Sequence, residues 1–166
     1  MKNQNLATKI FQRYIKDKDI RKFKKSIFYY LFYRCLRSFF NVPLIVKIYN
    51  FYLLSNNRKN KASYSILQKC DFFDVSEINF IKKISREFKI FLIDCGSNFG
   101  FYSLFVSSLS SSNEVISLEA SQETLNEFKD NLSLNNFKNI KYLNRAVFHK
   151  DDQKVVFNES EKDWES

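Results

Sequence analysis

The chain has 166 residues, a formal net charge of +9 at pH 7, only two glycines and one proline. This length suffices for one domain with a buried core. Its three cysteines form no C-x-x-C pair, so the sequence supports neither a metal site nor a disulfide framework and favours a reducing, cytoplasmic setting. No apolar segment of a secretory signal follows the N-terminus, and charges interrupt the most apolar region, 26–55, before it reaches the roughly 18 residues of a membrane span.

The charge is distributed unevenly along the chain. Residues 1–69 contain sixteen Lys and Arg against two Asp, a net charge of +14, whereas residues 70–166 contain eleven Lys and Arg against sixteen Asp and Glu, a net charge of −5. This asymmetry indicates an anionic partner for the basic half. Three interpretations stay open: a helical cap with solvated charges, docking of residues 1–54 on an anionic surface such as the inner membrane, and nucleic-acid binding. The aromatic residues lie apart from the Lys-rich turns, which argues against nucleic acid.

Helices are predicted for most of the N-terminal part. Apolar residues at helical spacing predict helices over 6–17 and 19–40, and a further apolar helix over 44–54 follows Pro43, which ends or kinks the preceding one. The polar run 55–61 is the expected boundary. It divides the chain into a basic, aromatic-rich helical segment (1–62), a partial Rossmann-like domain (63–158) and an acidic tail (159–166).

The first elements after this boundary are a short strand and a helix. The strand is expected over 64–68. Asp74 and Glu77 form a capping-box pattern that predicts a helix start. The expected inner side of this helix carries Phe80, Ile81, Ile84 and Phe88.

Strands and helices then alternate regularly. Strands are predicted over 89–94, 115–118 and 140–143, with helices over 99–109 and after Ser121, the expected N-cap. The second of these helices carries an apolar stripe of Leu125, Phe128 and Leu132, and Asn135-Asn136 is expected to end it in a left-handed conformation.

The alternation predicts an α/β fold, an incomplete Rossmann-like sheet preceded by the N-terminal helical segment. A fourth strand is expected over 154–157, and no apolar strand follows it. The first strand is therefore expected to present an unpaired edge, through which the chain would self-associate.

The two glycines of the chain stand in one short stretch, Asp94-x-Gly96-x-Asn98-x-Gly100, between the first strand and its helix. The spacing differs from the dinucleotide fingerprint G-x-G-x-x-G, which serves a pyrophosphate. S-adenosylmethionine carries an amino-acid end, a sulfonium and a ribose instead. Asp94 is suited to its ammonium group, Gly96 permits close approach, and Asn98 donates or accepts beside it.

A second acid, Glu119, ends the next strand, 23 residues beyond Gly96. A carboxylate there can accept hydrogen bonds from two ribose hydroxyls. The alternative is that Asp94 and Glu119 merely end their strands. Two acids that end consecutive strands, with a Gly turn after the first, favour the cofactor interpretation.

Residues 89–150 resemble the FkbM-type family of S-adenosylmethionine-dependent methyltransferases, which has a Rossmann-like fold. The resemblance rests on the motifs 93–102 and 115–121, and on Leu125, Asn131, 134–136 and 144–147. The family more often has proline where this chain has Ala120, and its later strand with an Asp and a Glu-Gly pair has no counterpart here. The resemblance implies S-adenosyl-L-methionine as cofactor and a cofactor site made of Asp94, Gly96, Ser97, Asn98, Gly100, Tyr102, Glu119, Ala120 and Asn144.

The family also implies the chemistry, which is methyl transfer to an oxygen of a sugar, a glycan or a small metabolite. No catalytic residue is assigned, since His149, the only histidine, follows the third strand in a stretch typical of a solvated loop. Cys95 is interpreted as a packing residue rather than a nucleophile. Two other classes stay open, an NAD-dependent enzyme and a non-catalytic interaction module that keeps half of the fold.

Overall fold

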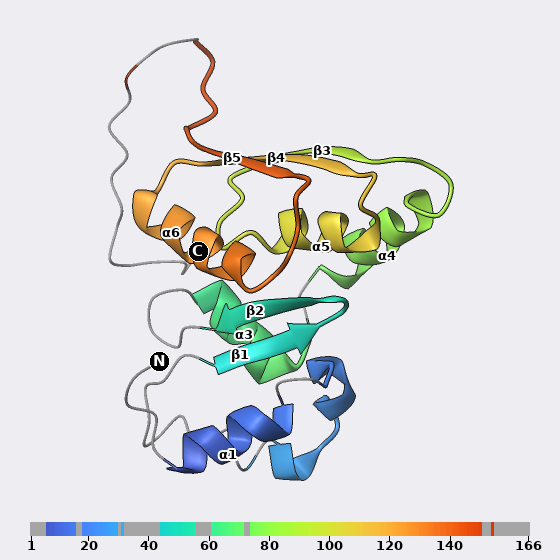
Figure 1. Cartoon of the computed structure of the whole chain (residues 1–166), viewed down its shortest axis with the longest axis vertical. Helices are drawn as coiled ribbons and strands as arrows, with labels where there is room; N and C mark the ends of the chain where they lie inside the picture. Colours follow the sequence, from blue (N-terminus) through green and yellow to red (C-terminus); the bar gives the residue numbers. More distant parts are fainter. Residues whose placement is uncertain are drawn as a thin grey trace.

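The computed structural model describes residues 6–15, 18–29, 31, 44–55, 61–71, 74–150 and 154. In these residues the chain forms two sheets and a set of short helices (Figure 1). In chain order the elements are α1 (Leu6–Ile15), the 3-10 helix η1 (Ile20–Phe23), β1 (Leu44–Ile48), β2 (Phe51–Ser55), α3 (Lys61–Lys69), α4 (Val75–Ile84), β3 (Phe91–Cys95), α5 (Phe101–Leu109), β4 (Glu114–Glu119), α6 (Gln122–Ser133) and β5 (Ile140–Asn144).

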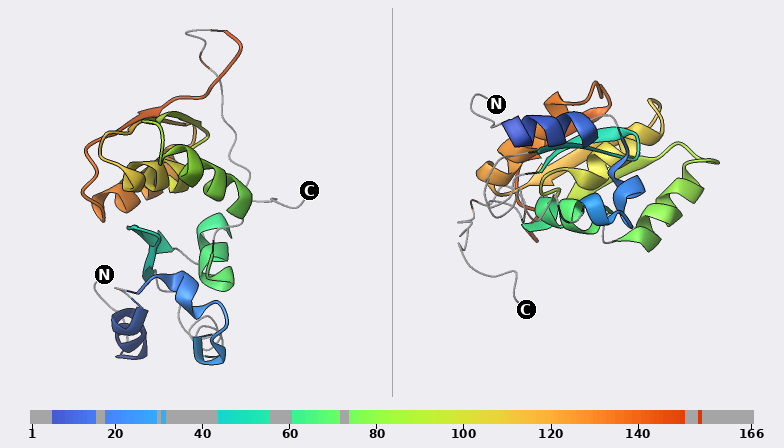
Figure 2. Two further views of the ribbon diagram at one scale, coloured as in Figure 1. Left: turned by 90° about the vertical axis from the view of Figure 1, so that its right-hand side faces the viewer. Right: turned by 90° about the horizontal axis from the view of Figure 1, so that it is seen from below.

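The central sheet is parallel, with strand order β3-β4-β5. The α/β alternation and the predicted Rossmann-like sheet are thereby confirmed, and Ser121 is the N-cap of α6, because its hydroxyl accepts a hydrogen bond from the backbone N–H of Thr124 at 3.1 Å. Helices α4, α5 and α6 all lie on one side of this sheet (Figures 1 and 2). Val115 and Ser117 of β4 are buried on that side, whereas Phe91 and Ile93 of β3 are exposed on the other.

The antiparallel hairpin of β1 and β2 lies beneath α5 and α6, opposite the parallel sheet (Figure 1). The helix predicted over 44–54 is therefore wrong. Leu44, Val46 and Ile48 are buried while the residues between them are half-buried, so the burial has the period of a strand, two residues, and not that of a helix. Helices α5 and α6 thus form a layer between two sheets.

Residues 61–69 form the helix α3, so the strand predicted over 64–68 is also wrong. The buried residues Ser63, Ile66 and Cys70 are spaced by three and four, the period of one helical face. Cys70 has a φ of +51° and ends the helix.

Other predicted details need correction. Asn135 and Asn136 are not left-handed, because the positive φ values of non-glycine residues in the described chain belong to Tyr49, Cys70 and Asn98. Helix α4 buries Ile78, while Phe80 and Phe88, both expected inside, are exposed. The helix predicted over 6–17 is confirmed as α1. The one over 19–40 is not continuous, since η1 is followed by turns, and its residues 32–40 lie outside the described chain.

Two of the predicted segments lie partly outside the described residues. Residues 56–60 of the predicted linker and 155–157 of the predicted fourth strand lie outside the described residues, and Lys154 is not in a strand. Within the described chain, no strand pairs with the outer edge of β3. The division at residue 62 and self-association through that edge stay predictions.

Two asparagines of the α6 region join it to the hairpin. The side chain of Asn135 accepts a hydrogen bond from the backbone N–H of Tyr52 and donates one to its carbonyl, both at 2.8 Å. Buried Asn131 accepts from the N–H of Leu54 at 2.7 Å and donates to the carbonyl of Phe99 at 2.9 Å. Asn131 therefore links the hairpin to the Gly turn after β3.

Candidate functional site

The turn between β3 and α5 has an unusual backbone. Gly96, Asn98 and Gly100 all have positive φ, at +77°, +52° and +86°. The N–H groups of Gly96 and Ser97 both donate to the carbonyl of Leu118, at 2.8 and 3.0 Å. The turn thus bends over the carboxyl end of β4, the edge of an α/β sheet at which ligands bind.

The two glycines have different surroundings. A Cβ built on Gly100 would lie 2.1 Å from the ring of Phe128, so this glycine is required for the close packing of α6 on the turn. A Cβ built on Gly96 would meet no atom within 4 Å. Gly96 is therefore the position at which a ligand can approach the backbone.

Asp94 and Glu119 lie on the same face of the sheet. Asp94 is paired in register with Ser117, and Glu119 stands two residues further along β4. Burial raises the pKa of Asp94 above its usual value; a hydrogen bond from the Ser103 hydroxyl opposes this shift, and the negative charge of Glu119 adds to it. The two acids thus stand on neighbouring strands at the same end of the sheet, as the sequence predicted, and the charge of Glu119 reaches Asp94.

Glu119 holds the turn in place. Its exposed fraction is 8%, and its two carboxylate oxygens accept hydrogen bonds from the backbone N–H groups of Asn98, at 2.8 Å, and of Ser121, at 2.9 Å. These bonds connect the Gly turn to the N-cap of α6. A carboxylate oxygen has about two acceptor positions, so each oxygen retains one.

Ser97 and Asn144 also lie at this end of the sheet. The Ser97 hydroxyl is buried and has no hydrogen-bond partner in the described part of the chain. The Asn144 side chain donates to the carbonyls of Glu119 and Ala120, at 2.9 and 3.0 Å. Asn144 and Ala120 thus fix the end of β5 against the end of β4.

Tyr102, another of the predicted cofactor residues, turns toward helix α4. Its hydroxyl donates a hydrogen bond to Asp74 at 2.7 Å, and burial together with this acid raises the pKa of Tyr102. Asp74 makes no side-chain cap bond to α4, so its carboxylate serves Tyr102 instead of the capping box expected from the sequence. Tyr102 therefore orients α5 relative to α4.

Ser103 and Asn131 support the site, although the sequence assigned neither of them a role. Ser103 contacts both Asp94 and Ser117, the latter at 2.7 Å between the two hydroxyls. The side-chain amide of Asn131 donates a hydrogen bond to the carbonyl of Phe99. The position of Ser103 three residues after Gly100 gives a weak signal, because it places the hydroxyl on the first turn of α5.

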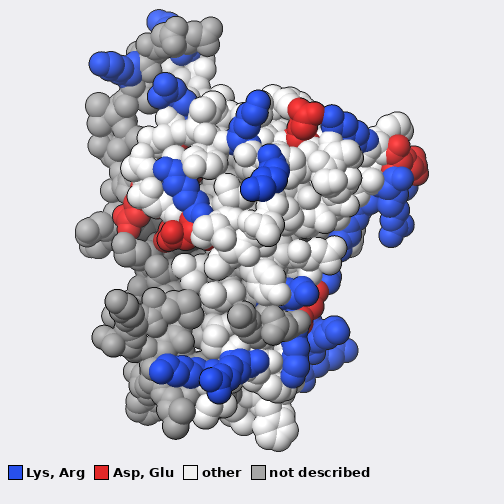
Figure 3. Space-filling model, viewed as in Figure 1, with Lys and Arg blue, Asp and Glu red and all other residues white. Residues whose placement is uncertain are grey.

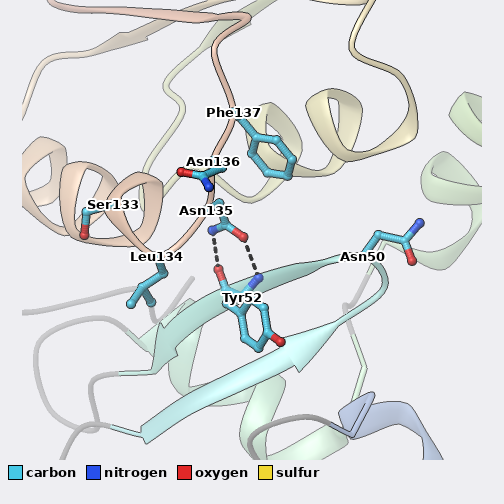
Figure 4. Close-up of a pocket in the computed structure, with 7 residues that line it drawn as sticks. All are labelled: Asn50, Tyr52, Ser133, Leu134, Asn135, Asn136 and Phe137. Carbon is cyan, nitrogen blue, oxygen red and sulfur yellow. Dashed lines mark hydrogen bonds between the residues drawn. The ribbon is translucent and has the colours of Figure 1, made fainter.

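An open pocket of about 500 Å³ lies elsewhere, between the hairpin turn and the C-terminal end of α6 (Figure 4). It is lined by Asn50, Tyr52 and residues 133–137, and it contains the Asn135–Tyr52 hydrogen bonds. The pocket lies near Asn131, whose side chain also donates to the carbonyl of Phe99 in the Gly turn. None of the predicted cofactor residues is among the residues that line it.

The remaining candidate groups add no chemistry to the site. In the described residues, no three His, Cys, Asp or Glu side chains cluster as metal ligands, and no helix is long and apolar enough to cross a membrane. Cys95 is exposed, contrary to the expected packing role, and burial raises the pKa of Cys70 to about 11. His149 packs on Phe148, with 4.2 Å between the ring centroids.

No family profile and no curated protein matches the chain. Among solved structures, the chain is similar to a SAM-dependent methyltransferase from Agrobacterium tumefaciens, with a TM-score of 0.48 and 13% sequence identity. The match covers 63% of this chain and 32% of the other, so the chain spans about a third of that protein's length. The FkbM-type resemblance stays a prediction.

Proposed function

We propose that this chain binds S-adenosylmethionine at the carboxyl ends of β3 and β4 and functions in methyl transfer. One observation carries the proposal: two carboxylates, Asp94 and Glu119, stand at the carboxyl ends of adjacent parallel strands, beside a Gly turn whose backbone is open at Gly96. When bound, the cofactor supplies an electrophilic methyl group on its sulfonium. The chain binds and orients that group.

Asp94 is suited to the ammonium group of the cofactor. Ser103 holds this carboxylate through its hydroxyl and its backbone N–H, and the two oxygens together have about four acceptor positions, so the carboxylate retains capacity for a further donor. Burial raises the pKa of Asp94, and a nearby cation would lower it again. The unfavourable burial of this carboxylate is therefore relieved by a positively charged ligand.

Glu119 is suited to the ribose. Its carboxylate is fixed by the N–H groups of Asn98 and Ser121, so it needs no reorganisation to accept two hydroxyl hydrogens. Ser97 supports the same assignment. Its buried hydroxyl has no partner among the described residues, and an unpaired buried polar group costs about 1–3 kcal/mol that a bound ligand can recover.

The acceptor follows only from the family resemblance, which supports an oxygen of a sugar, a glycan or a small metabolite. The described sheet builds one side of the cofactor crevice. In doubly wound sheets the other side of the crevice is built by the segment that follows a strand paired with the outer edge of β3. None of the described strands pairs with that edge.

Calorimetric titration of the full chain with S-adenosylmethionine tests the proposal, with NAD as the competing cofactor. The informative variant is Ser97→Ala, which removes a buried hydroxyl that pairs with nothing in the described chain. We expect unchanged or slightly higher stability together with roughly three- to tenfold weaker cofactor binding. Ser107→Ala is the matched control, because the buried hydroxyl of Ser107, on α5, likewise has no partner among the described residues.

Each outcome separates the candidate functions. Binding of S-adenosylmethionine that Ser97→Ala weakens and Ser107→Ala preserves supports the proposal. Binding of NAD alone would favour the dinucleotide-dependent enzyme. A folded chain that binds neither molecule would favour the non-catalytic interaction module.

A further inference from the structure

The end of the molecule furthest from the parallel sheet carries a surface that the proposed cofactor site does not use. Helix α1 and the segment 18–29 form this end in both views (Figures 1 and 2). Its exposed side chains are mainly basic or apolar. We name this surface the basic end and define it by Lys9, Ile10, Arg13, Tyr14, Lys22, Lys25, Ile27, Phe28 and Leu31.

The buried contacts of helix α1 determine which of its side chains face solvent. Phe11 and Ile15 are buried, and the Gln12 side chain donates to the carbonyl of Ile45 at 2.7 Å and accepts from its N–H at 2.8 Å. The opposite face consequently points to solvent. It carries a basic pair, Lys9 and Arg13, next to an apolar pair, Ile10 and Tyr14, each spaced by four residues on the helix.

A second apolar group follows η1. The exposed fractions are 62% for Ile27, 80% for Phe28 and 57% for Leu31. Between them Tyr29 is buried and stacks on Phe23, with 5.5 Å between ring centroids. This anchor holds the segment on the molecule while its large apolar neighbours project outward.

Among the described residues, no acid forms an ion pair with the cations that define the basic end. Asp19, the one acid described between residues 6 and 31, is already paired with Arg21, and Lys24 is paired with Asp71. No ion pair within the described chain involves Lys9, Arg13, Lys22 or Lys25. Figure 3 shows Lys and Arg side chains on this end of the molecule, and others over the part with the parallel sheet.

We infer that the basic end docks on an anionic lipid surface. Lys9, Arg13, Lys22 and Lys25 would lie at the headgroups, and Ile27, Phe28 and Leu31 would enter the interface. Ile27 and Leu31 are aliphatic and offer no flat face on which bases stack, which favours lipid over nucleic acid. The aromatic rings of Phe28 and Tyr14 suit either partner. The inference is independent of the proposed methyl transfer.

Co-sedimentation of the full chain with vesicles tests this inference. We compare phosphatidylcholine vesicles with vesicles that also contain phosphatidylglycerol, at low and high salt, and use a duplex oligonucleotide as competitor. Two variants address the surface, Lys9→Gln/Arg13→Gln for its charge and Phe28→Ser for its apolar part. Their matched controls are Lys83→Gln/Arg86→Gln and Phe80→Ser, which change exposed residues of the same types in α4 and just after it.

We expect binding to anionic vesicles that salt weakens, and a loss of about an order of magnitude in the Lys9/Arg13 variant. Phe28→Ser is expected to weaken binding severalfold, while both controls bind like the native chain. Equal recovery on neutral and anionic vesicles would overturn the inference, as would equal losses in the controls. If the chain binds the oligonucleotide and does not bind vesicles, the partner is nucleic acid and the inference is overturned.

Discussion

The carboxylate of Glu119 accepts a hydrogen bond from the backbone N–H of Asn98, at 2.8 Å, and so fixes the residue with positive φ in the middle of the Gly turn. Its other oxygen holds the N–H of Ser121. Glu119 is therefore a structural residue as well as a candidate ribose ligand.

Glu119→Ala is expected to lower the free energy of unfolding, because it leaves two backbone N–H groups without their acceptor. Each lost acceptor costs about 1–3 kcal/mol where water does not replace it. Urea denaturation measures the change. Stability equal to that of the native chain would mean that the turn is held without this carboxylate.

Asp94→Asn is expected to have the opposite effect on stability. The pKa of Asp94 is raised in the folded state, so the folded chain binds its proton more readily than the unfolded chain. The contribution of Asp94 to stability is therefore greatest at low pH and is lost as the pH rises through the folded-state pKa of this carboxyl group. The neutral amide avoids this loss, so the variant should be more stable than the native chain at neutral pH and equally stable in acid.

The same variant should bind S-adenosylmethionine much more weakly, since it lacks the charge that faces the ammonium group. Thermal unfolding at several pH values and calorimetric titration measure the two effects. A variant that gains stability and keeps full affinity would remove Asp94 from the proposed site.

The two glycines should respond differently to alanine. Both substitutions place a Cβ at positive φ, which costs roughly 1–2 kcal/mol. Gly100→Ala also collides with Phe128, which should add about 1–3 kcal/mol. In a double-mutant cycle, Phe128→Leu should recover part of the loss for Gly100→Ala and none of it for Gly96→Ala.

Much of the fold after residue 74 was predictable from the sequence. The apolar strands ending in Asp94 and Glu119 are separated by helices of ordinary length, and Ser121 is a strong N-cap. The hairpin was not predictable in this way. Its turn contains Tyr49 at a φ of +52°, where Gly or Asn is usual, and the short apolar run before it fits a buried strand or helix equally well.

The candidate site was predictable in its residues but not in their contacts. The positions of Asp94, Gly96 and Glu119 follow from strand ends and a Gly turn. The partner of Gly100 is a ring 28 residues away, and the partners of Glu119 are backbone groups, which leave no pattern in the sequence. Contacts of this kind arise only when the strands are in register.

Asn131→Ala is expected to lower the free energy of unfolding by about 1–3 kcal/mol, because it leaves the N–H of Leu54 and the carbonyl of Phe99 without their partner. Asn126→Ala is the matched control, since Asn126 is exposed on the same helix and bonds only to Gln122 among the described residues. Equal effects of the two substitutions in urea denaturation would argue against the Asn131 link.

The side-chain amides of Gln12, Asn131 and Asn135, which bond to the backbone of the hairpin, carry no charge, so ionic strength should affect these bonds little. Salt screens the Lys and Arg side chains of the basic end but leaves neutral hydrogen bonds and apolar packing in place. A rise in ionic strength is therefore expected to detach the chain from an anionic surface without loosening helix α1 or the hairpin. Hydrogen exchange should show the amides of Ile45, Tyr52 and Leu54 equally protected in low and high salt, so that the chain leaves the surface as one intact unit.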